Sequence, residues 1–174
     1  MNKNFLSSAF LAMSMLSFYS LADQVQINIT AKVTAKTCAV SSKTSYFLVN
    51  LATGNLRDAV VGVPFSESSF TINLEDCPLN ITTAHVNFSA ESDTDMPNLL
   101  KIANDSDSDA TGVAIGLYDK NGKNIDIRSN ATDFLINHAE AINYLYFSAA
   151  YLITSDKALP GKVKSFAFFE ISYD

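Results

Sequence analysis

The sequence predicts an all-β sandwich. Short segments in which apolar and polar residues alternate recur between turn residues, a spacing typical of packed antiparallel sheets. Helix signals are poor by comparison, and residues 56–61 and 133–142 are the two places where a turn or a short helix is expected. The expected strands are residues 46–51, 70–74, 84–90, 112–119, 124–127, 144–153 and 163–173.

The amino-terminal residues predict an export signal. Residues 1–22 contain Lys3, an apolar run that ends at Leu21, and a small residue, Ala22, at the expected cleavage point. No later stretch approaches the roughly 20 apolar residues that a membrane-spanning helix needs. We therefore expect a mature chain that starts at residue 23, is exported, does not insert into a membrane and forms one domain.

Residues 23–34 have the pattern of a strand with one apolar face. The polar residues on its other face include Asn28 and Lys32. No turn residue follows that would fold this segment back. The pattern alone leaves open whether it pairs inside its own sheet or elsewhere. The apolar face consists of Val25, Ile27, Ile29, Ala31 and Val33.

Cys38 and Cys77 are the only two cysteines. In an exported chain a disulfide between them is expected, because a metal site needs more ligands and a redox pair is usually closely spaced. The bond closes a loop of about 40 residues, which the chain-entropy model values at roughly 3–4.5 kcal/mol.

The last strand pattern reaches the end of the chain. One face carries Phe166, Phe168 and Glu170 together with lysines and is expected to face solvent. The other face is expected to be buried, so the domain stops on a core strand. That face consists of Val163, Ser165, Ala167, Phe169, Ile171 and Tyr173.

A hairpin is expected around Asn121-Gly122. This pair lies between two alternating runs, and the central positions of a tight hairpin turn favour residues that tolerate positive φ.

Charge and residue types exclude several function classes. The chain has 18 acidic and 12 basic residues, which disfavours binding to nucleic acid or to an anionic membrane. His85 and His138 are the only histidines, and neither adjoins a nucleophile motif, so no enzyme is expected. A calcium loop starting at Asp105 would have Ala110 at the glycine position and Gly116 at the glutamate position, so we expect a solvated loop and no metal or cofactor.

Several features together resemble pilins of the type 1 (chaperone/usher) fimbrial family. The alternating segment precedes Cys38, and Cys77 follows a strand pattern in residues 70–76. A further matching segment covers residues 111–122. Tyr173 is the penultimate residue, and Gly161 is the fourteenth from the end, as in the family's carboxy-terminal motif.

The resemblance implies an incomplete immunoglobulin-like sandwich, residues 35–174, that lacks its last strand. In this family a donor strand from another subunit completes the fold in trans, and residues 23–34 would be that donor-strand extension. The implied partners are a periplasmic pilus chaperone, an outer-membrane usher and neighbouring fimbrial subunits. The chain would pass through the periplasm to the cell surface and become part of an adhesive fimbrium.

The resemblance also assigns roles to residues. Val25, Ile27, Ile29, Ala31 and Val33 would enter the groove of the neighbouring subunit. The groove of this subunit would be lined by Gly161, Val163, Ala167, Phe169, Ile171 and Tyr173, with the Asp174 carboxylate as the contact for the chaperone. Ala31 stands where the family often has glycine, which favours a minor or adaptor-like subunit. Phe166 and Phe168 stand where many relatives have threonine or small residues.

A self-contained β-sandwich binding module, periplasmic or secreted and adhesin-like, is the alternative. Tip adhesins of the same machinery usually carry a separate lectin domain and no donor extension, whereas this chain has the extension and no room for the lectin domain. A self-contained module would be a stable monomer.

Overall fold

The computed structural model describes residues 37–174, and the expected signal peptide and donor extension lie outside the described residues. No helix among these residues is long and apolar enough to cross a membrane. The strands are β1 (Ala39–Val40), β2 (Phe65–Glu75), β3 (Thr83–Ala90), β4 (Val113–Asp119), β5 (Asn124–Ile125), β6 (Thr132–Leu135), β7 (Ile142–Ile153) and β8 (Ala167–Tyr173).

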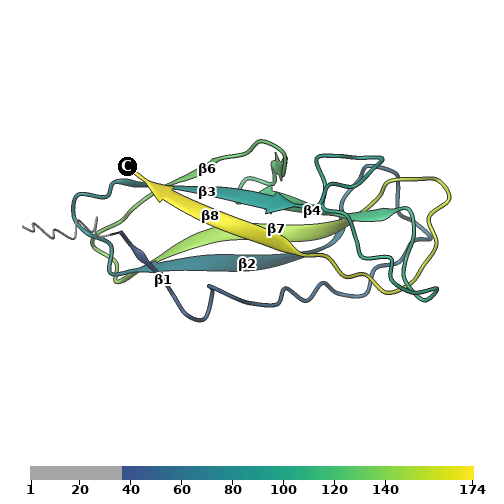
Figure 1. Cartoon of the computed structure of the whole chain (residues 1–174), viewed down its shortest axis with the longest axis horizontal. Coiled ribbons are helices and arrows are strands. Elements are labelled where there is room, and N and C mark those ends of the chain that lie inside the picture. Colours follow the sequence, from purple (N-terminus) through teal and green to yellow (C-terminus); the bar gives the residue numbers. More distant parts are fainter. Residues whose placement is uncertain (1–36) are drawn as a thin grey trace, which may run out of the picture. The chain divides into compact units, whose positions relative to one another are not determined.

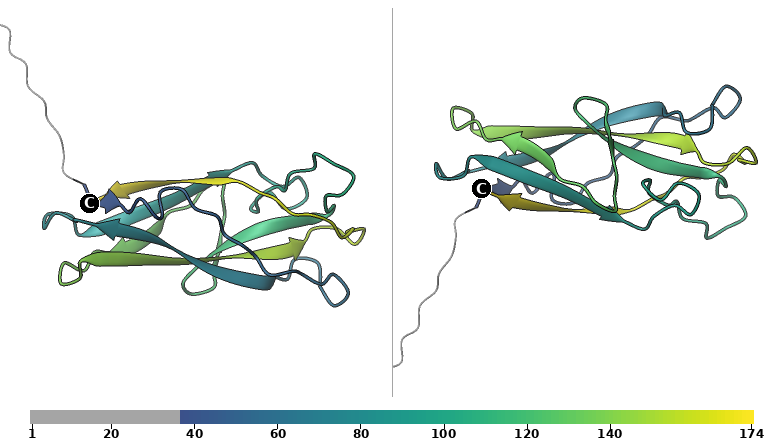
Figure 2. Two further views of the ribbon diagram at one scale, coloured as in Figure 1. Left: turned by 90° about the horizontal axis from the view of Figure 1, so that it is seen from below. Right: turned by 90° about the horizontal axis from the view of Figure 1, so that it is seen from above.

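The strands form two antiparallel sheets that pack face to face. One sheet has five strands in the order β1-β2-β7-β4-β5, and the other has three in the order β6-β3-β8 (Figure 1). Consecutive strands therefore often lie in different sheets, as Figure 2 shows from two further sides. Among the described strands, β8 borders only β3 and β1 borders only β2, so β8 and β1 are each an edge strand of their sheet.

The core lies between the sheets and follows the alternation of the strands. Ile72 and Leu74 of β2, Val86 of β3 and Leu145 of β7 are fully buried. Because successive side chains of a strand point to opposite faces, every second residue of these strands reaches the core. The two sheets and the core between them confirm the all-β sandwich that the sequence predicts.

Most of the expected strands are present, with shifted ends. The strand β2 begins at Phe65 rather than at residue 70, β4 begins one residue late, and the sheet pairing of β8 begins at Ala167 rather than at residue 163. The two regions expected to hold a turn or a short helix hold turns: residues 56–61 contain a turn at residues 57–58 and a bridge from Val61 to Ile153, and residues 133–142 begin in β6 and contain a turn at residues 138–139. The sequence did not predict the short strand β6, because Phe134 is the one buried side chain in it and a single residue shows no alternation.

Residues 46–51 do not join a sheet, although the sequence predicts a strand there. Their burial alternates as in a strand, with Phe47, Val49 and Leu51 half-buried and the residues between them exposed. Within residues 37–174 this segment makes no backbone hydrogen bond. It has the side-chain pattern of a strand but no neighbour to pair with.

The hairpin at Asn121-Gly122 connects β4 to β5. The Gly122 amide donates to the Asp119 carbonyl oxygen over 2.9 Å, and Gly122 has φ +76°. Asn121 does not have a positive φ among the described residues, so only one of the two positions uses the left-handed region. The Asp119 side chain instead accepts from the amides of Asn121 and Lys123 and holds the turn.

Candidate functional site

The free edge of β8 is the candidate site. Thr83 and Asp174 exchange two backbone hydrogen bonds, of 3.1 and 3.3 Å, at the end of the β3–β8 ladder. In an antiparallel ladder, such hydrogen-bonded pairs alternate with pairs whose backbone groups point outward. Counting from Thr83 and Asp174, the residues of β8 whose N–H and C=O groups point away from β3 are Ala167, Phe169, Ile171 and Tyr173.

At these four residues the backbone N–H and C=O groups therefore point to the free edge of the sheet. Their backbone groups have no backbone partner within residues 37–174. The side chains of Phe169, Ile171 and Tyr173 also face inward and pack half-buried against the core. Unpaired backbone groups and an apolar face along one edge are the arrangement that accepts an added strand.

The inward face of β8 is half-buried rather than buried, which corrects the expectation from sequence. Val163, Phe169, Ile171 and Tyr173 are partly exposed, and Ala167 is exposed. The reason is that no described strand lies beyond β8 to cover these side chains. The outward face is as expected, because Phe166 and Phe168 are 74% and 76% exposed.

Aromatic rings form the floor beneath this edge. Phe169 lies 6.5 Å from Phe88 of β3, measured between ring centroids. Phe88 in turn packs edge-on against Phe147 of β7 at 5.0 Å. Edge-to-face pairs at such distances are favourable packing arrangements, so the floor has a defined shape.

Residues 46–51 lie on the side of the core that Phe70 of β2 lines. The ring of Phe47 lies 5.6 Å from the ring of Phe70, and Val49 and Leu51 contact the core. Like β8, the segment has no backbone partner within residues 37–174. We use the term groove for the inward face of β8 together with residues 46–51, both of which pack half-buried on the core and lack a backbone partner on this side within residues 37–174. The groove-lining role of the β8 residues stays a prediction, and the sequence analysis assigned no such role to residues 46–51, although their alternation was the signal for one.

Gly161 lies where the chain approaches β8. A Cβ atom at this position would be 2.4 Å from the Ala110 nitrogen and 2.4 Å from the Asp109 carbonyl carbon. The close approach is held by Ala110, whose amide donates to the Lys162 carbonyl oxygen over 2.9 Å. Only glycine fits here, so Gly161 positions the segment that leads into β8 and does not line the groove with a side chain.

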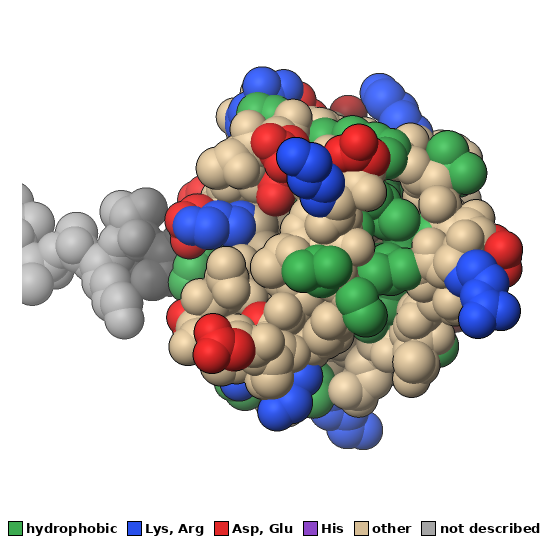
Figure 3. All heavy atoms as spheres, turned by 90° about the vertical axis from the view of Figure 1, so that its right-hand side faces the viewer, with side chains coloured by type: hydrophobic (Ala, Val, Ile, Leu, Met, Phe, Trp, Pro, Cys, Tyr) green, Lys and Arg blue, Asp and Glu red, His purple; other side chains and the backbone are tan. Residues whose placement is uncertain are grey.

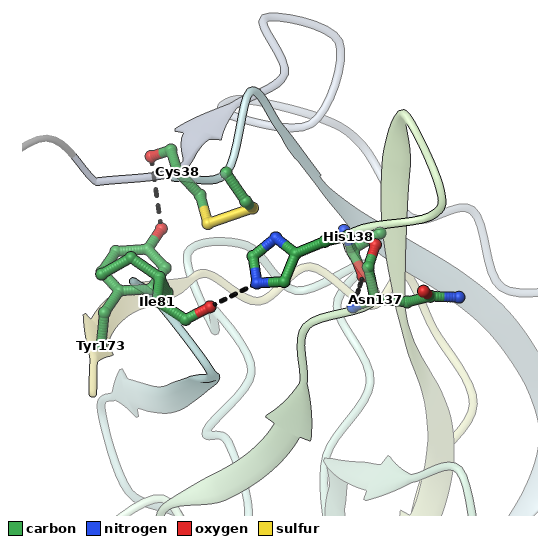
Figure 4. Close-up of a disulfide and its surroundings, with 7 residues drawn as sticks. Cys38, Ile81, Asn137, His138 and Tyr173 are labelled. Atoms are coloured by element: carbon green, nitrogen blue, oxygen red, sulfur yellow. Dashed lines mark hydrogen bonds between the residues drawn. A yellow bond between two sulfur atoms is a disulfide. The ribbon is translucent and has the colours of Figure 1, made fainter. Parts of the chain in front are cut away.

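The disulfide ties β1 to the end of β2 within one sheet, and Tyr173 links that sheet to β8 of the other at one end of the groove. Cys38 and Cys77 are bonded, which confirms the expected pair, and their Cα atoms are 4.1 Å apart. The Tyr173 hydroxyl donates to the Cys38 carbonyl oxygen over 3.4 Å (Figure 4). His138 Nε2 lies 2.9 Å from the Ile81 carbonyl oxygen and links two loops at the same end. Burial raises the pKa of Tyr173, so the phenol stays protonated and able to donate.

His85 holds the last residue of the chain in place. Its Nδ1 lies 2.7 Å from Asp133 Oδ1, and its Nε2 lies 2.9 Å from Asp174 Oδ2. A neutral imidazole donates from only one nitrogen, whereas the charged ring donates from both. Hydrogen bonds to Asp133 and then to Asp174 raise the pKa of His85. Sequence reasoning missed this bridge across β6, β3 and β8, because the three residues meet only through strand register.

Comparison with known proteins places the chain in a family. The family described as fimbrial protein matches residues 27–174. The chain is 32% identical over 155 residues to a fimbrial subunit type 1 of Salmonella typhimurium, covering 85% of this chain and 82% of that protein. The chain therefore belongs to the fimbrial protein family.

Solved structures agree with this assignment. A Burkholderia pseudomallei antigen and type I fimbria protein has a TM-score of 0.59 and 27% identity, covering 80% of this chain and 91% of the other. The P pilus rod subunit PapA has the same fold, with a TM-score of 0.63 at 17% identity, over 80% of this chain and all of the other. The chain is a structural fimbrial subunit with an immunoglobulin-like fold, and it is not an enzyme.

Proposed function

We propose that this subunit polymerises by donor-strand exchange. Residues 23–34 of one subunit would lie along β8 of the next and complete its sandwich. Val25, Ile27, Ile29, Ala31 and Val33 would enter the groove, and their backbone would pair with the free edge of β8. The groove would be lined by Val163, Ala167, Phe169, Ile171 and Tyr173.

The observation that carries the proposal is that the same residues of β8 have unpaired backbone groups at the sheet edge and apolar side chains turned toward the core. At Phe169, Ile171 and Tyr173 the backbone groups at the edge are unpaired, and the apolar side chains are only half-buried. A donor strand with period two would satisfy both at once. Burying its four larger side chains at about 1.5–3 kcal/mol each gives an upper bound of about 6–12 kcal/mol before ordering costs.

A periplasmic chaperone would occupy the groove before the donor strand does, and an outer-membrane usher would guide the exchange. The open groove supports a need for such protection, because an unpaired apolar edge promotes aggregation. Asp174 would be the contact for the chaperone. Its carbonyl oxygen accepts from the Thr82 amide over 2.7 Å and its side chain binds His85, so the terminus is held in position.

The self-contained binding module is the less favoured function. It would require a closed sandwich, whereas the edge of β8 has no partner within residues 37–174. The minor or adaptor-like position in the fibre stays a prediction, based on Ala31 in the donor segment.

Co-expression with a cognate chaperone tests the proposal. The mature chain is compared with a variant that lacks residues 23–34, and both capture by the chaperone and transfer to a second subunit are measured. We expect the shortened chain to be captured as well as the mature chain, but to be unable to donate a strand. Loss of capture in the shortened chain would contradict the separation of donor and acceptor roles.

A further inference from the structure

The described domain has two ends with different surfaces. Cys38, the loop of residues 76–82 and Asp174 lie together at one end, since β1 pairs with the end of β2 and β3 begins opposite Tyr173. We call this the carboxy-terminal end. The opposite end, here called the far end, contains the loops of residues 52–64 and 154–163.

An apolar patch lies at the far end. It consists of Val60, Val61, Val63 and Leu159, whose side chains are between 45% and 60% exposed. Figure 3 looks onto this end and shows hydrophobic side chains gathered near its centre, with charged side chains around them. Single exposed apolar residues are ordinary, but a contiguous group with a polar rim indicates a contact surface.

The backbone holds the patch in a fixed arrangement. The Val63 amide donates to the Val60 carbonyl oxygen over 3.0 Å, and the Gly62 amide donates to Ile153 of β7 over 2.9 Å. Leu159 exchanges two backbone hydrogen bonds with Thr111, which lies just before β4. Because β4 and β7 are neighbours, both loops are tied to one pair of strands. A surface that is already ordered loses little conformational freedom on binding.

Chain connectivity places a neighbouring subunit at this end, given the donor-strand exchange proposed above. Residues 23–34 end four positions before Cys38, so a donor strand leaves its own subunit at the carboxy-terminal end. A donor parallel to β8 would bring that subunit to the acceptor's carboxy-terminal end, where the acceptor's own extension begins. The donating subunit and the subunit that receives the acceptor's own extension would then occupy the same space at that end. An antiparallel donor instead brings the subunit to the acceptor's far end.

The linker is too short to keep the two bodies apart. Val33 and Cys38 are five residues apart, which spans at most about 17 Å at 3.3 Å per residue. Cys38 is bonded to Cys77, and Leu79 follows two residues later with 83% of its surface exposed. A highly exposed leucine of the carboxy-terminal end therefore lies close in sequence to the disulfide that follows the donor segment.

We propose that Leu79 of the donating subunit packs on the patch of Val60, Val61, Val63 and Leu159 of the accepting subunit. The partner is a second copy of this chain, bound head to tail. Such a contact is heterologous, because it joins two different surfaces, and it repeats along a fibre. It would fix the angle between successive subunits that the donor strand alone leaves free.

Cysteine cross-linking tests the contact directly. A chain with Leu79→Cys and Val61→Cys is assembled into fibres with chaperone and usher and then oxidised. We expect a ladder of covalent oligomers from fibres and none from chaperone-bound monomers. The matched control is Leu79→Cys with Tyr146→Cys, because Tyr146 is 55% exposed but lies on the outer face of β7. An equal ladder from the control, or none from the first chain, would overturn the proposal.

Charge substitutions separate this contact from donor-strand exchange itself. We expect Leu79→Asp to speed dissociation of a two-subunit complex about tenfold and Val61→Lys in the acceptor to restore much of the loss. A synthetic peptide of residues 23–34 should bind the Val61→Lys acceptor as it binds the original chain. Weakened peptide binding would show that Val61 belongs to the groove and would overturn the separate patch. Failure of the peptide to bind either acceptor would instead contradict donor-strand exchange.

Discussion

The hydroxyl of Tyr173 donates to the carbonyl oxygen of Cys38 and thereby links the terminal strand of one sheet to the edge strand of the other. At 3.4 Å the hydrogen bond is long, so Tyr173→Phe should lower the free energy of unfolding by only about 0.5 kcal/mol. Tyr173→Ala also removes a ring that packs on the core and should cost about 2 kcal/mol or more. Chemical denaturation of the chain saturated with donor peptide measures both. Equal losses for the two variants would contradict this division between hydrogen bond and ring.

The Cys38–Cys77 disulfide joins β1 to the loop after β2, over a sequence separation of 39. Replacing both cysteines with serine should lower the free energy of unfolding by about 3–4.5 kcal/mol, since the unfolded chain gains freedom. The same denaturation experiment, with the peptide present, measures the loss. A change below about 1 kcal/mol would show that the bond is not a main support of the domain.

Gly161 and Gly122 form a matched pair for substitution by alanine. At Gly161 the new Cβ would strike the backbone of Asp109 and Ala110, which cannot rotate away, so we expect a loss of about 3 kcal/mol and poorer chaperone capture. At Gly122 nothing lies within 4 Å and only the positive φ opposes alanine, so the loss should be about 1 kcal/mol. A smaller loss at Gly161 than at Gly122 would contradict the close packing.

His85 predicts a pH dependence of stability. Its pKa is raised in the folded state by Asp133 and Asp174, so the folded state binds the proton more tightly than the unfolded state. The stabilisation is fully present below the ordinary pKa of about 6.5 and is lost as the pH rises through the raised value. Unfolding between pH 5 and pH 9 should show this loss in the original chain and in His138→Gln, but not in His85→Gln. The same slope in His85→Gln would assign the effect to another group.

Strand patterns with a strong period could be predicted from the sequence. The strand β3 buries every second residue along most of its length, and in β8 half-buried residues alternate with exposed ones, so the inward and outward faces of both strands follow from the alternation. The disulfide was also predictable, because an exported chain with two cysteines offers only one pair.

The remaining features depend on contacts between distant residues. The segment 46–51 has the pattern of a strand, but it has no backbone partner within residues 37–174, and local alternation does not say whether a partner strand is present. The bridge from Asp133 through His85 to Asp174 depends on the register of three strands, which local periodicity does not contain. The patch around Val61 joins two loops through Ile153 and Thr111, and neither loop has a regular pattern.

Hydrogen exchange of individual amides in β8 tests donor-strand exchange most directly. The chain without residues 23–34, released from chaperone, is mixed with a peptide of residues 23–34, and a peptide with Ile27→Asp and Ile29→Asp is the control. We predict new protection at the amides of Phe169, Ile171 and Tyr173, which face the groove, and little change at Phe168, Glu170 and Ser172, which already face β3. Uniform protection along β8, or none at the three groove-facing amides, would contradict the account.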